Sequence, residues 1–165
     1  MSVDLSLDLR ISAFEQSAGD LGTKQYNQTW GVVASLARGT GASQTDKVWT
    51  DSGTAAASAN TVDLMGSLTD INGATISFAG GVVLIAVKNT STTTGYNLTV
   101  GAGSNPFAGW SGAGANTRII KPGGFEIWYS PIDDVVPVAG TGDIITLDPG
   151  ANTVTYDIMI VGRSA

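Results

Sequence analysis

The side chains best suited by type to do chemistry are the aspartates of the carboxy-terminal third. Asp133 and Asp134 are adjacent, and Asp143 and Asp148 flank a short apolar segment. Two carboxylates suffice for glycoside hydrolysis when one has a raised pKa in a cleft, and loop carboxylates also bind Ca²⁺. Adjacent aspartates in turns are ordinarily solvated and cap backbone amides, and their spacing fits no EF-hand. The pattern therefore predicts no catalytic and no metal-ligating residue, and it leaves open whether a loop binds calcium.

Other templates for catalysis lack their essential residue types. The chain contains no His and no Cys, which excludes Ser/His/Asp and Cys/His hydrolases, Cys/His zinc sites and disulfides. Gly39-Thr40-Gly41 is not followed by the Lys of a phosphate-binding loop. Ser104 and Ser111 lie near glycines but have no His partner. We therefore expect a protein that is not an enzyme and has no cofactor.

Large aromatic side chains are the remaining candidates for a functional surface. Phe107 and Trp110 lie in a long glycine-rich segment, residues 105–116, and long loops in compact domains are often functional. Either the two side chains fold back and fill an open end of the domain, or they are buried against another chain, where such residues are enriched. The same choice applies to Trp49, which shares a strand face with Lys47. Phe107, Trp110 and Trp49 are thus the candidate protein interface.

Composition limits the class of protein and its partners. A chain of 165 residues with 42% hydrophobic residues is long enough for one domain with a packed core, and we expect a single β-sandwich domain over residues 1–165. With 14 acidic and 8 basic residues, the net charge is −6, which argues against a nucleic-acid partner. The longest apolar run, residues 80–87, is too short to span a membrane, so we expect no membrane partner.

The first part of the chain has two strand patterns. Val3–Ile11 alternates apolar and polar residues, as expected of a strand with one wet face, and residues 28–37 predict a second strand. Ser12–Gly22 is interpreted as a short helix or a loop. An amino-terminal strand pairs either within its own chain or with the sheet edge of a neighbouring chain, and both remain open.

The rest of the chain also consists of short strand patterns separated by turns. Asn72-Gly73 favours a tight turn between antiparallel strands, and Gly81–Lys88 is a short apolar run typical of a strand buried on both faces. About ten strands and no long amphipathic helix predict an all-β fold, an antiparallel β-sandwich that is jelly-roll-like. The other predicted strands cover residues 46–51, 54–64, 75–78, 96–100, 117–120, 125–130, 135–138, 143–147 and 153–161.

Several segments resemble small structural proteins of tailed bacteriophages and prophages. They are residues 39–51, 63–70 and 73–75, then Pro122-Gly123-Gly124, 139–143, 154–158 and 160–162, and the likeness extends over most of residues 3 to 162. These segments are sheet and turn signatures, so the resemblance transfers no functional residue.

The resemblance implies a virion structural protein made in the host cytoplasm. It implies a jelly-roll capsid decoration, or cement, protein that binds the exterior of the major capsid protein lattice as a homotrimer and stabilises the head. The alternative is a head-fibre or tail-fibre adhesion domain that binds host surface glycan through the loop of Phe107 and Trp110.

Overall fold

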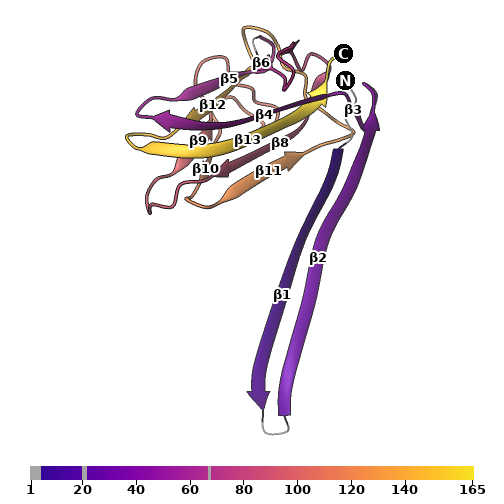
Figure 1. Cartoon of the computed structure of the whole chain (residues 1–165), viewed down its shortest axis with the longest axis vertical. Coiled ribbons are helices and arrows are strands. Elements are labelled where there is room, and N and C mark those ends of the chain that lie inside the picture. The colour runs from indigo at the N-terminus through magenta and orange to yellow at the C-terminus, as the bar shows by residue number, and fades with distance from the viewer. Residues whose placement is uncertain (1–4, 20–21, 67) are drawn as a thin grey trace.

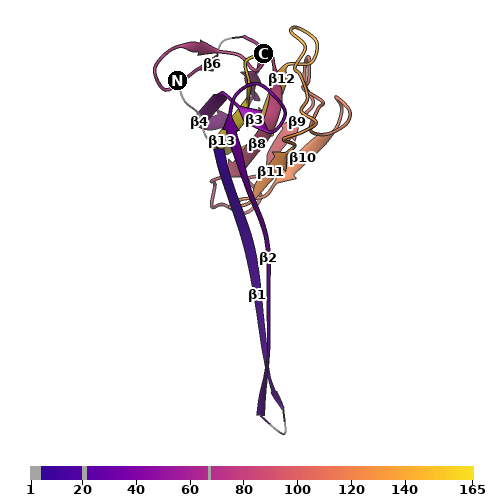
Figure 2. The same cartoon turned by 90° about the vertical axis from the view of Figure 1, so that its right-hand side faces the viewer.

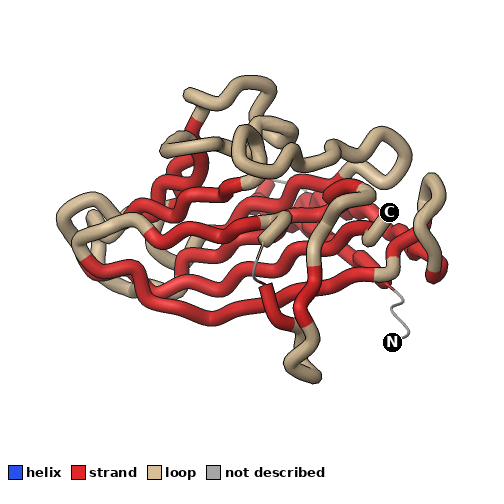
Figure 3. The backbone as a smooth tube through the Cα atoms, turned by 90° about the horizontal axis from the view of Figure 1, so that it is seen from above, coloured by secondary structure: helices blue, strands red, loops and turns tan. Residues whose placement is uncertain are grey.

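The computed structural model describes residues 5–19, 22–66 and 68–165. These residues form strands and loops throughout and no helix, so no helix among them could cross a membrane (Figure 3). The fold is an antiparallel β-sandwich from which a long β-hairpin projects (Figure 1). The all-β sandwich predicted from the sequence is therefore confirmed.

Two four-stranded sheets make up the sandwich. One has the order β10-β9-β12-β5 and the other the order β11-β8-β13-β4, with every neighbouring pair antiparallel. The strands are β4 (Lys47–Ala56), β5 (Asn60–Asp63), β8 (Gly81–Asn89), β9 (Leu98–Gly101), β10 (Thr117–Ile120), β11 (Phe125–Tyr129), β12 (Ile144–Asp148) and β13 (Thr153–Arg163). The chain passes from one sheet to the other at almost every connection, so each sheet combines strands that are distant in the sequence.

The core lies between the two sheets. β8 is apolar almost throughout and its residues 81–85 are all buried, as the uninterrupted apolar run predicts. β13 alternates, and Val154, Tyr156, Ile158 and Ile160 point into the core. Leu98, Val100, Ile145 and Leu147 oppose them from the other sheet. Of the residues that the structure describes, none from before Trp49 belongs to this core cluster or packs against it.

A small hairpin forms around Asn72-Gly73, as predicted. β6 (Leu68–Thr69) pairs with β7 (Thr75–Ile76) in antiparallel register. The Asp70 carboxylate accepts hydrogen bonds from the amides of Asn72 and Ala74, at 2.8 and 2.9 Å, and Gly73 takes the positive φ that the turn requires.

The projecting hairpin consists of β1 (Leu5–Gly19) and β2 (Gly22–Arg38), and we call it the arm. At about 3.4 Å per residue, β1 is about 50 Å long. Two perpendicular views show the arm leaving the sandwich at one end and extending away from it (Figures 1 and 2). After the arm, β3 (Gln44–Thr45) pairs in parallel with Ala37 and Arg38 and brings the chain back to the sandwich.

Three expectations from the sequence differ from the structure. The described part of Ser12–Gly22 is neither helix nor loop, because the ladder between β1 and β2 continues through it to Gly19 and Gly22. Residues 54–64 form two strands separated by a turn at residues 57–59. Residues 135–138 form isolated bridges because Val135 meets Val82 and Val138 meets Gly142. Val3 and Asp4, at the start of the first predicted strand, lie outside the described residues.

Candidate functional site: the projecting arm

One face of the arm is apolar. In the register of the hairpin, Ile11 lies opposite Trp30 and Leu9 opposite Val32, so these side chains share one face. We call this face the apolar stripe. It consists of Leu5, Leu7, Leu9, Ile11 and Ala13 of β1 and Trp30, Val32, Ala34 and Leu36 of β2.

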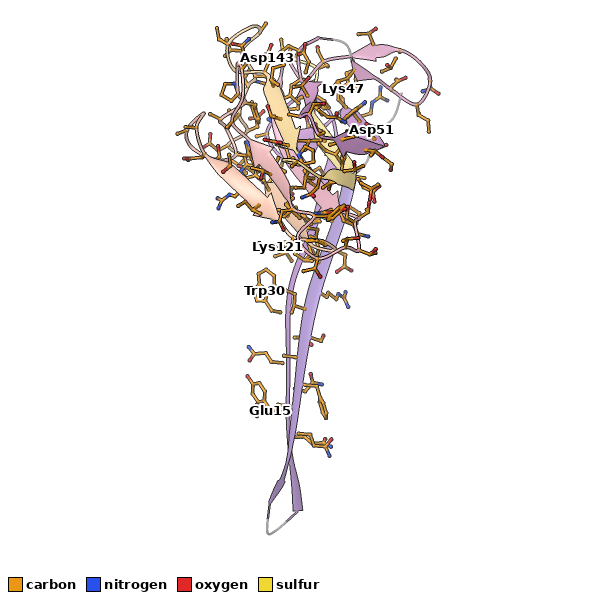
Figure 4. All side chains as sticks on the ribbon, turned by 90° about the vertical axis from the view of Figure 1, so that its left-hand side faces the viewer. Glu15, Trp30, Lys47, Asp51, Lys121 and Asp143 are labelled. Atoms are coloured by element: carbon orange, nitrogen blue, oxygen red, sulfur yellow. The ribbon has the colours of Figure 1, made fainter. Side chains whose placement is uncertain are left out.

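Exposure of the stripe increases with distance from the sandwich. Leu36, at the foot of the arm, is 4% exposed, whereas Trp30 is 54% and Ile11 56% exposed. Figure 4 shows the Trp30 side chain projecting from the arm, outside the sandwich. A monomer therefore exposes Ile11 and Trp30 to solvent on one contiguous apolar face, on which Leu7, Leu9 and Val32 are half-buried.

The opposite face of the arm is mainly polar. Arg10 donates to the Asp8 carboxylate at 3.0 Å, and the hydroxyls of Ser12 and Thr29 are hydrogen-bonded at 3.2 Å. Phe14 and Val33 are the apolar exceptions on this face, at 61% and 68% exposure. They are separated along the arm and do not form a continuous surface.

Both long edges of the arm are open. Apart from the two pairs that Ala37 and Arg38 make with β3, the described residues of β1 and β2 pair only with each other. A lone two-stranded hairpin in water is at best marginally stable, and unpaired edges readily accept another strand. The arm therefore has both a side-chain face and backbone edges that a protein partner can cover.

A network of hydrogen bonds fixes the foot of the arm to the sandwich. The Arg163 guanidinium, 3% exposed, donates to the carbonyls of Gln44 at 3.0 Å and Pro131 at 2.8 Å. Its Nη1 lies 2.6 Å from Oδ2 of Asp134. The buried Thr45 hydroxyl donates to the Gly162 carbonyl at 2.7 Å. β3, and with it the end of the arm, is thus held by the last strand of the sandwich.

The structure places two of the three aromatic candidates in the core. Phe107 is 3% and Trp110 9% exposed, and Trp110 Nε1 donates to the Phe107 carbonyl at 2.9 Å. The Phe107 amide donates to the carbonyl of Ile144 in β12 at 2.8 Å, which fixes the loop against the sheet. The structure thus shows that Phe107 and Trp110 fold back and fill the domain. They form no exposed contact surface for another chain.

Trp49 is partly buried and packs against the same core cluster. It lies at the rim of two shallow hollows, one shared with Thr69, Asp70 and Ile71 and the other with Asn60 and Tyr156. Because part of the Trp49 side chain is exposed, it stays a candidate contact residue, while the rest of the side chain packs against the core.

The outer face of the sheet β11-β8-β13-β4 carries a second apolar surface. Phe125, Lys88, Asp157 and Ser52 lie in one row across the four strands, and the Ser52 hydroxyl donates to Asp157 at 2.7 Å. The next row is Ile127, Ala86, Met159 and Thr50. Together these rows line a shallow hollow of about 260 Å³, at whose rim Phe125 is 60% exposed.

Of the four aspartates considered for catalysis or calcium, three have structural partners for their carboxylates, and at Asp133 only the backbone carbonyl has one. Asp134 pairs with Arg163, Asp143 accepts from the Gly140 amide at 2.7 Å, and Asp148 accepts from the Gly150 amide at 2.8 Å. The Asp133 carbonyl accepts from the Ser130 hydroxyl at 2.6 Å. Asp143 lies at the end of the sandwich far from the tip of the arm (Figure 4). In the described part of the chain, no three acidic side chains are grouped as a metal site requires.

The site that sequence reasoning missed is the stripe as a surface. The alternation that predicts a strand at Val3–Ile11 also predicts one dry face, and Trp30, Val32, Ala34 and Leu36 alternate in the same way. The alternation therefore indicates the apolar face, but it does not indicate that the two strands pair with each other outside the sandwich.

Comparisons with known proteins identify no relative: no protein-family model, no curated protein and no solved structure matches the chain.

Proposed function

We propose that the chain is a bacteriophage virion structural protein, a capsid decoration protein that binds the exterior of the major capsid lattice and stabilises the head. The observation that carries this proposal is the arm. A sandwich holds a ribbon about 50 Å long away from its own core, with an exposed apolar face of the kind that protein partners cover. Such a shape suits a protein that connects subunits of an assembly.

The strand order of the sandwich supports the proposal. Eight strands in two four-stranded sheets, with repeated crossings between the sheets, agree with a jelly roll, the architecture that the phage resemblance implies. The glycan-binding alternative depended on an exposed aromatic loop at Phe107 and Trp110. Because both side chains are buried, no observation favours that function over capsid binding.

The direct test is binding to undecorated capsids of the phage that encodes the chain. We expect saturable co-sedimentation at a fixed ratio to the capsid lattice, and decorated shells that withstand higher temperature than bare ones. Absence of saturable binding would contradict the proposal. Binding to host surface glycan, with no binding to capsids, would establish the fibre alternative instead.

A further inference from the structure

The two long edges of the arm differ in charge. β1 carries Asp8, Arg10 and Glu15 along its edge, whereas residues 25–37 of β2 include no Asp, Glu, Lys or Arg. Charged side chains, prolines and bulges are the usual devices that keep a sheet edge from pairing with another chain. β2 also contains no proline, and its register with β1 is unbroken over the described pairs. The edge of β2 is therefore the less protected of the two.

The structure already has a strand on the β2 edge. At the foot of the arm, β3 pairs with Ala37 and Arg38 on the side of β2 opposite to β1. Because β3 has only two residues, residues 22–36 of β2 have no partner on this side among the described residues. The open edge over residues 25–36 is about 40 Å long at about 3.4 Å per residue. A strand that continued the line of β3 along β2 would extend a sheet whose third strand is present at one end.

The side chains of β2 indicate what kind of strand fits on this edge. Trp30 and Val32 lie on the apolar stripe, and Thr29 and Val33 lie on the opposite face. Side chains of neighbouring strands contact each other across a sheet, so an added strand would place alternate side chains beside each of these pairs. A charged residue on the stripe side would lie among apolar groups, at a cost in free energy. The fitting segment is therefore extended, uncharged on the stripe side, and apolar at alternate positions.

A second copy of the chain would leave the apolar stripe uncovered. It would offer its own β2 edge, but edge pairing joins strands side by side and covers neither face of the sheet. Ile11 and Trp30 of both copies would stay exposed on a wider apolar surface, and soluble proteins rarely expose large contiguous surfaces of this kind. A capsid subunit can present an extended segment for the edge and a protein surface for the stripe together.

We propose that residues 25–36 of β2 bind an extended segment of the major capsid protein, which joins the arm as a strand beside β2 and in line with β3. Main-chain hydrogen bonds along the edge hold the segment, and its apolar side chains widen the stripe. The inference rests on the proposed function, because that function supplies the partner. It adds which edge of the arm pairs and what kind of sequence the capsid protein presents to it.

Lysine substitutions at paired positions test which edge is used. Ser6 lies opposite Ser35 and Ser12 opposite Thr29, and all four residues are exposed on the face of the arm opposite to the stripe. The test variant Thr29→Lys/Ser35→Lys adds two charges to β2. The matched control Ser6→Lys/Ser12→Lys adds them at the same two pairs on β1. Both variants gain the same charge and lose the hydrogen bond between the hydroxyls of Ser12 and Thr29, so they differ chiefly in the edge that carries the lysines.

The measurement is the binding of each full-length variant to undecorated capsids of the phage that encodes the chain. We expect the β2 variant to bind about 10-fold or more weakly than the unchanged protein, because lysines keep another strand from the edge and its main-chain hydrogen bonds are lost. The β1 control is expected to bind within about threefold of the unchanged protein, since surface substitutions away from a contact have small effects. Equal losses for the two variants would overturn the inference.

Hydrogen exchange of the capsid-bound chain gives a readout that requires no variant. Alternate amides of β2 point away from β1, and pairing with an added strand protects them. We expect capsid binding to slow exchange in residues 25–36 of β2 much more than in residues 5–16 of β1, whose outer edge stays open. Equal slowing in the two strands would show that the stripe binds the capsid without strand pairing at β2, which contradicts the inference.

The outcomes separate this inference from the proposed function. If the unchanged protein does not bind capsids, the proposed function fails and the inference fails with it. If the unchanged protein binds and the two variants bind equally well, the inference alone fails. Sedimentation velocity of the free proteins tests the second copy as the occupant. An assembly of the unchanged protein that the β2 variant loses and the β1 control keeps would assign the β2 edge to another copy of this chain, and the inference would be wrong.

Discussion

Arg163 joins segments that are far apart in the sequence. Replacing it by Met removes the charge partner of the Asp134 carboxylate, whose side chain is 16% exposed, and a hydrogen-bond donor to the carbonyls of Gln44 and Pro131, of which the Pro131 carbonyl keeps its bond from the Ser43 amide. We expect Arg163→Met to lower the free energy of unfolding by about 3–5 kcal/mol, the usual loss on breaking a buried ion pair. Chemical denaturation measures this directly.

The control for that substitution is Arg118→Met. Arg118 lies 3.3 Å from Glu126, but their side chains are 54% and 38% exposed. An exposed pair of this kind contributes at most about 1 kcal/mol. Similar losses for the two variants would show that Arg163 has no special role at the foot of the arm.

Two tryptophans have opposite roles. Trp110 is buried in the core with its indole N–H satisfied, so Trp110→Ala is expected to lower the free energy of unfolding by about 3–5 kcal/mol. Trp30→Ala removes an exposed side chain and is expected to change the unfolding of the monomer by no more than about 0.5 kcal/mol. Denaturation at concentrations where the chain is monomeric distinguishes the two, and the opposite ranking would refute the assignment of Trp110 to the core.

The contrast between Trp110 and Trp30 also marks what the sequence could not decide. Both lie among small and polar residues, and local pattern gives no information on which aromatic turns inward. The burial of Trp110 depends on the contact of its loop with Ile144 of β12, a residue that is far away in the chain. The exposure of Trp30 depends on where a whole strand pair is placed.

At the scale of the element, the arm and the sandwich are separable. The core cluster contains no described residue of β1 or β2. Replacing residues 13–28 by Asn-Gly, a two-residue turn between the paired Ser12 and Thr29, is therefore expected to leave the unfolding midpoint of the sandwich unchanged. Circular dichroism during denaturation checks this, and a large drop in the midpoint would show that the arm supports the core.

Elements with a complete local signal were predictable. β8 and β13 follow their predicted ranges closely, because an apolar run or an alternation of apolar and polar residues specifies both the strand and its buried face. The distal part of β1 was not predictable, since Phe14, Glu15 and Gln16 break the alternation of apolar and polar residues. This part of β1 is a strand because β2 pairs with it, and the pairing cannot be predicted from the local sequence of β1.

At the scale of the whole molecule, stability is expected to be unequal. The amides of β8 and β13 are bonded on both sides within a packed sheet, whereas those of the arm have one partner and little cover. Hydrogen exchange should therefore be slow in β8 and β13 and fast in the arm of a dilute monomer. Protection of the dilute arm equal to that of β8 would contradict this picture.

β13 lies between β4 and β8, although a ribosome makes it after every other strand of the sandwich. Until β13 has left the ribosome, β4 has no neighbouring strand in its sheet, and Arg163, which bonds to β3, is absent. The arm, whose pairing is local, is complete much earlier. A newly made chain therefore has a paired arm before its sandwich can close.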